Sequence, residues 1–299
     1  MRDTFLRTLL EEAKGDDRIW LLTADFGFSV LEPFEEAFPE RYINVGIAEQ
    51  NAIGIAAGLA LRGKIPYVYT AVPFATSRPY EQIKVDCAYM NTNVRIVGVG
   101  SGFSYGPAGA THHALDDIAI MRTLPNMAVL APGGVNEVET LTKYSVNHCG
   151  PLYMRLGRRG EPRFENSVEF GKLSKLFEGE DFAIIATSSM LADAYNTALE
   201  YRKQGACPAL FSAHTLKPFD ESAVLDLVDR KIPIVSVEEH NIIGGLFFAI
   251  SEVVAKSGKA AKILPIAVRD EFSHCVGSQR YIKNHLGLGN LKEQIDAFL

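Results

Sequence analysis

The sequence predicts two α/β domains, each a doubly wound fold on a mainly parallel sheet. Three observations favour this fold class. Short apolar runs rich in β-branched residues alternate with longer segments of helical periodicity. The alternation stops in a polar stretch around residues 158–180 and then restarts. The length of 299 residues suits two domains of typical size. Strands that alternate with helices need right-handed crossovers, which make neighbouring strands parallel.

The elements of the first half follow from periodicity. Apolar runs predict strands at residues 19–25, 67–70, 94–100, 127–132 and 151–156. Helical spacing predicts helices at residues 3–13, 48–63, 79–90 and 134–146. We therefore expect a first domain at residues 1–165.

The polar segment that follows carries mixed charges, glycines and a proline, so residues 166–180 are interpreted as a linker with room for a short hairpin. Alternation then resumes, and we expect a second domain at residues 181–299. Its expected strands are residues 181–189, 207–214, 232–240 and 263–270, and its expected helices are 191–205, 221–230, 244–258 and 288–299.

Composition excludes several classes of function. The formal net charge of −6 does not predict a nucleic-acid partner. No apolar run is long enough to cross a membrane, and the first residues lack the layout of a signal peptide. The cysteines fit neither a zinc site nor a disulfide framework, so we expect free thiols and a cytoplasmic protein. They are Cys87, Cys149, Cys207 and Cys275.

The most informative segment is RYINVGIAEQNAIGIAAGLALRG, at residues 41–63. A strand is expected to end near Val45, Gly46 allows a tight turn, and a helix opens around Ala48. Glu49 then lies at a helix start beyond the carboxyl end of a strand, where open α/β sheets bind ligands. Taken alone, Glu49 would be explained as a favourable partner of the helix dipole.

Two further segments carry candidate chemistry. YTAVPFATSRPYEQIKVD places Phe74 in a loop between a strand and a helix. GSGFSYGPAGATHHALDDIA is a long glycine-rich loop that ends in His112 and His113. Loops of this length between regular elements are often functional. Taken alone, Phe74 reads as a core aromatic, and His112 as a capping or solvated side chain.

Four motifs in this order resemble the pyrimidine-binding domain of transketolases. They are GIAEQNAIGIAAGLA, ATSRPYEQI, ATHHALDDIAIMRTLPNMAVLAP and LYMRLGR. The likeness covers about residues 2–158 and continues more loosely through LKPFD and EEHNIIGG, which are similar to the family's C-terminal domain. The resemblance implies a thiamine-diphosphate enzyme that transfers a two-carbon ketol unit between a ketose and an aldose, either of which can carry a phosphate.

The resemblance also implies roles for individual residues. In that family a glutamate at the place of Glu49 hydrogen-bonds the aminopyrimidine ring of the cofactor and promotes its imino tautomer. A carboxyl group in apolar surroundings can share a proton with such a ring nitrogen. Phe74 matches the aromatic that stacks on the pyrimidine, and Asp25 an aspartate near the thiazolium. His112 matches a histidine that faces the reacting carbon. His113, its neighbour, is a further candidate for the substrate.

Phosphate contacts are expected from arginines, which pair with such groups in a bidentate manner. Arg158 matches an arginine that grips a sugar phosphate. Arg2 and Thr23 fall near other phosphate-contacting positions. The alternative for both arginines is a solvated surface side chain.

This sequence departs from the family's pattern in several places. Two aromatic positions of the pyrimidine pocket read as Ala71 and Ser77, and Arg78 and Tyr80 are available to refill the space. An acidic residue that reads a sugar hydroxyl is replaced by Ala108. A phosphate-binding histidine aligns near Gly100 or Ser101. These changes make a branched, modified or unphosphorylated sugar an alternative substrate.

The chain lacks the GDG motif and following asparagine that hold the cofactor's diphosphate and its Mg²⁺ (or Ca²⁺) in this family. The resemblance therefore implies a separate N-terminal, diphosphate-binding transketolase subunit and an α₂β₂ assembly. The segment Glu238–His240 could suggest a metal site, but we interpret it as a turn at a sheet end.

Three other identities compete. A beta subunit of a 2-oxo-acid dehydrogenase has the same domain order. A 1-deoxyxylulose-5-phosphate synthase usually keeps all its domains on one chain. A non-catalytic partner of a holoenzyme would have no need to retain Glu49, Phe74 and His112 together. An adjacent reading frame with the GDG motif would favour the split enzyme.

Overall fold

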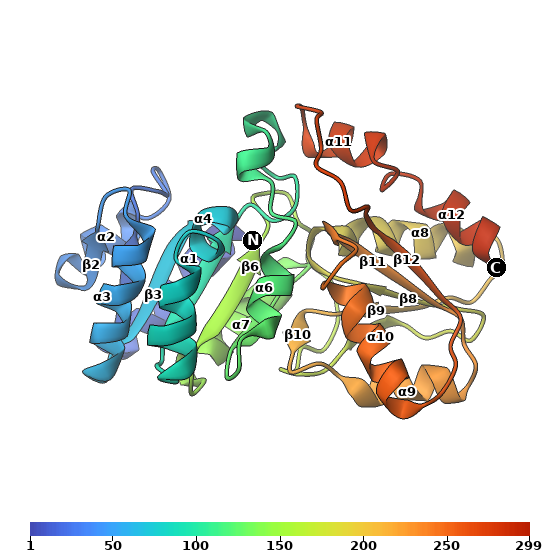
Figure 1. Ribbon diagram of the computed structural model, residues 1–299, viewed down its shortest axis with the longest axis horizontal. Coiled ribbons are helices and arrows are strands. Elements are labelled where there is room, and N and C mark those ends of the chain that lie inside the picture. Colours follow the sequence, from blue (N-terminus) through green and yellow to red (C-terminus); the bar gives the residue numbers. More distant parts are fainter.

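The computed structural model describes residues 1–299. Figure 1 shows two α/β halves side by side, each with a twisted sheet covered by helices on both faces. This is the predicted fold class of two mainly parallel domains. None of the helices has the length and apolar character needed to span a bilayer.

The first sheet has the strand order β10-β5-β6-β4-β3-β1-β2. All its pairings are parallel except that of β10 with β5. The central strands are buried along their whole length, because helices cover both faces. The strands are β1 (Ile19–Thr23), β2 (Tyr42–Asn44), β3 (Ile65–Ala71), β4 (Arg95–Val99), β5 (Ala128–Leu130), β6 (Leu152–Leu156) and β10 (Thr215–Lys217).

Two helical layers enclose this sheet. On one side α1 and α7 contribute Phe5, Leu9 and Leu141 to the core, and on the other α3 and η2 contribute Ile53 and Ile83. The single helix expected at residues 79–90 is a short α-turn, α5, that continues as the π-helix η2. The helices are α1 (Arg2–Gly15), α2 (Glu32–Ala37), α3 (Glu49–Leu61), α4 (Val72–Thr76), α5 (Tyr80–Gln82), η2 (Ile83–Tyr89), α6 (Asp117–Thr123) and α7 (Val135–Asn147), with short 3₁₀ turns η1 (Pro39–Arg41), η3 (Gly106–Ala108) and η4 (Ala110–His112).

The second sheet has the order β12-β11-β8-β9-β7, and only the pairing of β7 with β9 is antiparallel. Its strands are β7 (Ser174–Phe177), β8 (Ala183–Ala186), β9 (Ala209–Ser212), β11 (Ile234–Asn241) and β12 (Ile263–Val268). Its helices are the 3₁₀ turn η5 (Ser188–Met190) and α8 (Leu191–Lys203), α9 (Glu221–Asp229), α10 (Leu246–Ser257), α11 (Gln279–His285) and α12 (Leu291–Phe298).

Two strands cross the expected domain boundaries. The segment interpreted as a linker, 166–180, contains β7, which forms an edge of the second sheet. The expected second domain, 181–299, contributes β10 to the edge of the first sheet. Both are edge strands of three or four residues, too short to give a clear pattern in the sequence. The two halves therefore share backbone hydrogen bonds as well as packed side chains.

Candidate active site

The candidate residues lie where the strands of the first sheet end. β1, β3, β4 and β6 run parallel, so their carboxyl ends share one edge of the sheet. Asp25 follows β1, Phe74 follows β3, and Arg158 follows β6. The loop at residues 100–116 follows β4 and carries both histidines. In Figure 1 this green segment rises above the sheet, beside α11 of the second half. Such an edge is the usual ligand site of an open α/β sheet.

Glu49 is the first residue of α3 and is 4% exposed. One carboxylate oxygen, Oε1, accepts a hydrogen bond of 2.8 Å from Nη1 of Arg78. The guanidinium of Arg78 also lies over the Phe74 ring, with its Cζ atom 3.9 Å from the ring centroid. The surroundings of Glu49 were expected to be apolar, but they also include the cationic side chain of Arg78. Arg78 thus contacts both Glu49 and Phe74.

His112 packs against the Phe74 ring. The two ring centroids are 5.0 Å apart at an angle of 69°, an edge-to-face contact. The Nδ1 atom of His112 shares a hydrogen bond of 2.9 Å with Oγ1 of Thr111. The imidazole is only partly buried. Phe74 thus contacts both a partly buried imidazole and the guanidinium that binds Glu49.

Asp25 lies at the same edge in a left-handed backbone conformation, with φ of 53°. Its backbone N–H donates to Oδ1 of Asn44 at 3.1 Å, and that oxygen also accepts from the N–H of Gly46. Asn44 therefore ties the Asp25 turn to the turn before α3. The Asp25 carboxylate itself is exposed.

Thr23 differs from expectation. It was predicted near a phosphate, but it is 1% exposed and its hydroxyl is engaged within the chain. Oγ1 donates to the carbonyl oxygen of Phe26 at 2.6 Å and accepts from the Phe26 N–H at 3.2 Å. A hydroxyl bonded back to its own backbone shapes a turn. Thr23 fixes the turn that follows β1 and has no free group for a ligand.

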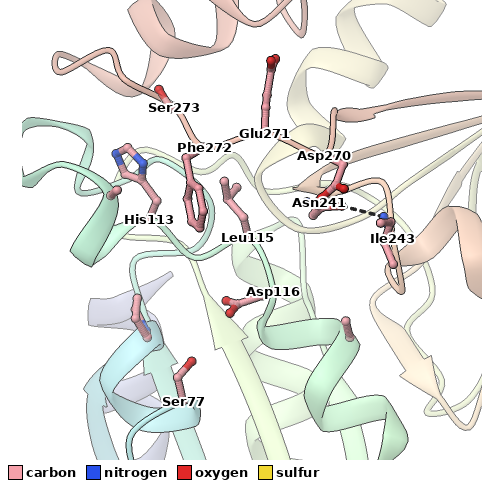
Figure 2. A pocket seen from close by; sticks show the side chains of 13 residues that line it. Ser77, His113, Leu115, Asp116, Asn241, Ile243, Asp270, Glu271, Phe272 and Ser273 are labelled. Atoms are coloured by element: carbon pink, nitrogen blue, oxygen red, sulfur yellow. Dashed lines mark hydrogen bonds between the residues drawn. The ribbon is translucent and has the colours of Figure 1, made fainter.

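His113 packs against a different aromatic ring from its neighbour His112. Its ring lies edge-on to Phe103 at 4.9 Å, and burial lowers the pKa of His113. It lines a cavity of about 560 Å³ between the two halves, where Phe272, Asp270 and Asn241 come from the second half (Figure 2). His113 therefore faces this cavity, whereas His112 packs on Phe74.

The two arginines expected at a phosphate approach one tyrosine. The Cζ atom of Arg158 lies 5.0 Å from the ring centroid of Tyr105. The charges of Arg158 and Arg2 both act on the phenol, although burial is the larger effect and raises the pKa of Tyr105. Nε of Arg2 also donates to Asp3 at 3.0 Å. Tyr105 was not identified from the sequence, because its position depends on the way its ring packs on Gly100.

A second set of polar residues missed in the sequence is fully buried. Nε of Arg155 donates to Oδ2 of Asp117 at 2.9 Å, and the hydroxyl of Tyr153 donates to the same oxygen at 2.7 Å. Nη2 of Arg155 reaches the carbonyl oxygens of Ala114 and Glu239. The guanidinium thus joins the end of the histidine loop to β11 of the second sheet.

Glu239 secures the other end of that loop. Its Oε1 accepts the N–H of Phe103 at 3.0 Å, while Oε2 accepts from Ser189 and from Gln279. Gly102 has φ of 57°, and a Cβ at that position would lie 2.4 Å from the Glu239 carboxyl carbon. A glycine is therefore required where the loop meets this carboxylate.

The neighbours of Glu239 are also engaged within the chain. Glu238 accepts the backbone N–H groups of Leu246 and Phe247 at the start of α10, and burial raises its pKa to about 7. Burial lowers the pKa of His240 to about 4. These residues belong to β11 rather than to a turn: Glu238 anchors the start of α10, and Nε2 of His240 accepts the N–H of Ala119 in α6 at 3.4 Å. No three His, Cys, Asp or Glu side chains come together as a metal site.

The expected cofactor ring fits the group around Phe74. An aminopyrimidine is planar and carries nitrogen donors. In this structure the planar guanidinium of Arg78 stacks on Phe74 and donates an N–H to Glu49. The two residues thus present the stacking face and the acceptor that such a ring needs. Arg78 is 43% exposed at its side chain and has room to move aside.

Comparison with known proteins places the chain in a family. The description "Transketolase, pyrimidine binding domain" matches residues 1–161, and "Transketolase, C-terminal domain" matches residues 171–288. An apulose-4-phosphate transketolase subunit of Actinobacillus succinogenes is 35% identical over 92% of this chain and 89% of its own. The 6-deoxy-6-sulfo-D-fructose transketolase subunit SqwH of Clostridium sp. is 38% identical over 96% and 90%.

A solved structure described as a split gene transketolase, an inactive β4 tetramer, superposes with a TM-score of 0.91. It is 32% identical in sequence, and the match covers 100% of this chain and 97% of that one. The similarity therefore extends over both halves of the molecule. The chain belongs to the transketolase family, as a subunit made of its pyrimidine-binding and C-terminal domains.

Proposed function

We propose that this chain is the subunit of a thiamine-diphosphate-dependent transketolase that supplies the pyrimidine side of the active site and transfers a two-carbon ketol unit between sugars. One observation carries the proposal. A buried carboxylate and an aromatic face, Glu49 and Phe74, are set side by side at the strand ends and already hold a planar nitrogen donor between them.

Each residue then has a distinct task. Glu49 accepts from the pyrimidine ring and holds the proton there, while Phe74 supplies the stacking face. The bound cofactor supplies the chemistry that stabilises the developing charge on the substrate carbon. His112, 5.0 Å from Phe74 between ring centroids and accessible, donates to the substrate oxygen. Asp25 lies near the thiazolium end, and Arg78 borders the pyrimidine.

The substrates are sugars that carry an acidic group, or chemically similar sugars. The two relatives described above are named for apulose-4-phosphate and for 6-deoxy-6-sulfo-D-fructose. Arg158 and Arg2 supply positive charge around Tyr105. The hydroxyl-reading acid of other transketolases is Ala108 here, which favours a modified or branched sugar.

A second polypeptide completes the site. We propose a separate N-terminal subunit that binds the diphosphate together with Mg²⁺ (or Ca²⁺), in a cytoplasmic α₂β₂ enzyme. The description of the split-gene relative as an inactive β4 tetramer supports the need for such a partner.

Calorimetric titration with thiamine diphosphate and Mg²⁺ tests this division of labour. The chain alone should bind the cofactor weakly, because nothing in it holds the diphosphate. Addition of the partner subunit should strengthen binding by about 100-fold or more, since a closed site adds several charge-assisted contacts. Ketol transfer should appear only in the mixture. Tight, metal-dependent binding by the isolated chain would contradict the split site.

A further inference from the structure

Tyr105 lies between the candidate catalytic imidazole and the arginines. Its ring centroid is 6.4 Å from that of His112, and the Arg158 guanidinium lies over the same ring at 5.0 Å. Phe26 contacts the ring edge-on at 6.3 Å. Three segments that follow β1, β4 and β6 therefore hold this tyrosine at the edge of the sheet.

The place of the ring depends on a glycine. Gly100 directly follows β4 with φ of 89°, and a Cβ built there would lie 2.1 Å from Cε2 of Tyr105. Any side chain at position 100 would expel the ring. The position of the Tyr105 ring therefore requires glycine at position 100. The ring occupies the space into which a side chain at position 100 would project.

The hydroxyl of Tyr105 is free for a ligand. It makes no hydrogen bond within the chain, and its oxygen atom is not fully buried. The positive charges of Arg158 and Arg2 both act on it. By contrast the buried hydroxyls of Tyr67 and Tyr153 are bonded to Ser145 and Asp117. A solvent-accessible phenol beside the Arg158 guanidinium, and within reach of the charge of Arg2, is suited to bind an oxyanion.

We propose that Tyr105 is a specificity-determining residue, whose hydroxyl donates to the terminal oxyanion of the substrate beside Arg158 and Arg2. The ligand class is a sugar that ends in a phosphate or a sulfonate, both tetrahedral oxyanions. This proposal rests on the proposed ketol transfer, because it takes His112 to face the reacting end of the same substrate. Tyr105 then sets which sugars the enzyme accepts and leaves activation of the cofactor to Glu49.

The test compares Tyr105→Phe with wild type in the complex with the partner subunit. The variant keeps the ring over Gly100 and removes only the hydroxyl. Tyr281→Phe is the control, because Tyr281 is 53% exposed and lies on α11 in the second half. KM and kcat are measured for an aldose phosphate, its sulfonate analogue and the unsubstituted aldose.

Tyr105→Phe should raise KM for one or both acidic sugars roughly tenfold, the size expected for a lost hydrogen bond to a charged group. The kcat value and the kinetics of the neutral sugar should stay unchanged. The acidic sugar whose KM rises identifies phosphate or sulfonate as the group that Tyr105 binds. An equal change for neutral and acidic sugars, or no change at all, would overturn the proposal.

Titration of the same complex with inorganic phosphate and with methanesulfonate gives a second measurement that does not require turnover. Wild type should bind at least one of these ions, and Tyr105→Phe should bind it roughly tenfold more weakly. Equal affinity of the two proteins, or no binding to wild type, would overturn the role of Tyr105. Absence of ketol transfer with intact ion binding would instead refute the proposed function.

Discussion

Arg155 and Arg158 belong to one short motif, LYMRLGR, but serve opposite purposes. Arg155 is the last polar residue of β6, has no exposed surface and is bonded to Asp117 and two backbone carbonyls. Arg158 has left the strand and its guanidinium is exposed beside Tyr105. Two arginines only three positions apart therefore differ: Arg155 is a buried structural residue, and Arg158 is an exposed cation. The end of the strand marks the change.

The adjacent histidines repeat this difference. His112 keeps an accessible ring near Phe74, whereas His113 is buried against Phe103. Residue type alone therefore does not identify the site. What distinguishes the two regions is burial: Arg155 and His113 are enclosed by the chain, whereas Arg158 and His112 keep exposed surface. Buried partners hold the loop in place, and partly free groups remain available for a ligand.

The largest expected effect comes from breaking the buried region. Arg155→Ala leaves the Asp117 carboxylate buried without its cation, so the free energy of unfolding should fall by about 3–5 kcal/mol. Urea unfolding of the isolated chain measures this loss. Arg158→Ala is the matched control and should change stability by less than about 0.5 kcal/mol. Equal losses in the two variants would remove the distinction between the regions.

Substitution of the exposed arginine, Arg158, should have a smaller effect, and the effect should appear in substrate binding rather than in stability. Arg158→Ala should raise KM for a phosphorylated sugar by about 10- to 100-fold, because a charge-assisted contact to phosphate is lost. The KM for the unphosphorylated sugar should hardly move. Steady-state kinetics of the complex with its partner subunit checks both values. If KM is unchanged for both sugars, Arg158 has no role in binding the acidic group.

Periodicity was sufficient to predict the fold, because both sheets are built from buried parallel strands with strongly apolar runs. It also placed Glu49 at a helix start, because Gly46 and the end of β2 define that turn locally. The family resemblance selected Phe74 and His112, and the structure brings their rings into contact.

The remaining features depend on contacts between distant segments, which a single sequence does not encode in any periodicity. β10 pairs with a strand far earlier in the chain. Glu239 reaches Phe103 across the two halves. The Tyr105 ring packs on Gly100, and Arg78 stacks on Phe74. Thr23 was misassigned because the turn that consumes its hydroxyl is invisible at the level of residue types.

The most direct test of the account follows exchange of the thiazolium C2 proton of thiamine diphosphate for deuterium in the two-subunit complex. Glu49→Gln keeps the size of the side chain and removes the carboxylate. With the cofactor bound to the same extent, the exchange rate should fall by about 10²- to 10⁴-fold. Exchange at the wild-type rate in Glu49→Gln would contradict the central claim that this carboxylate activates the cofactor.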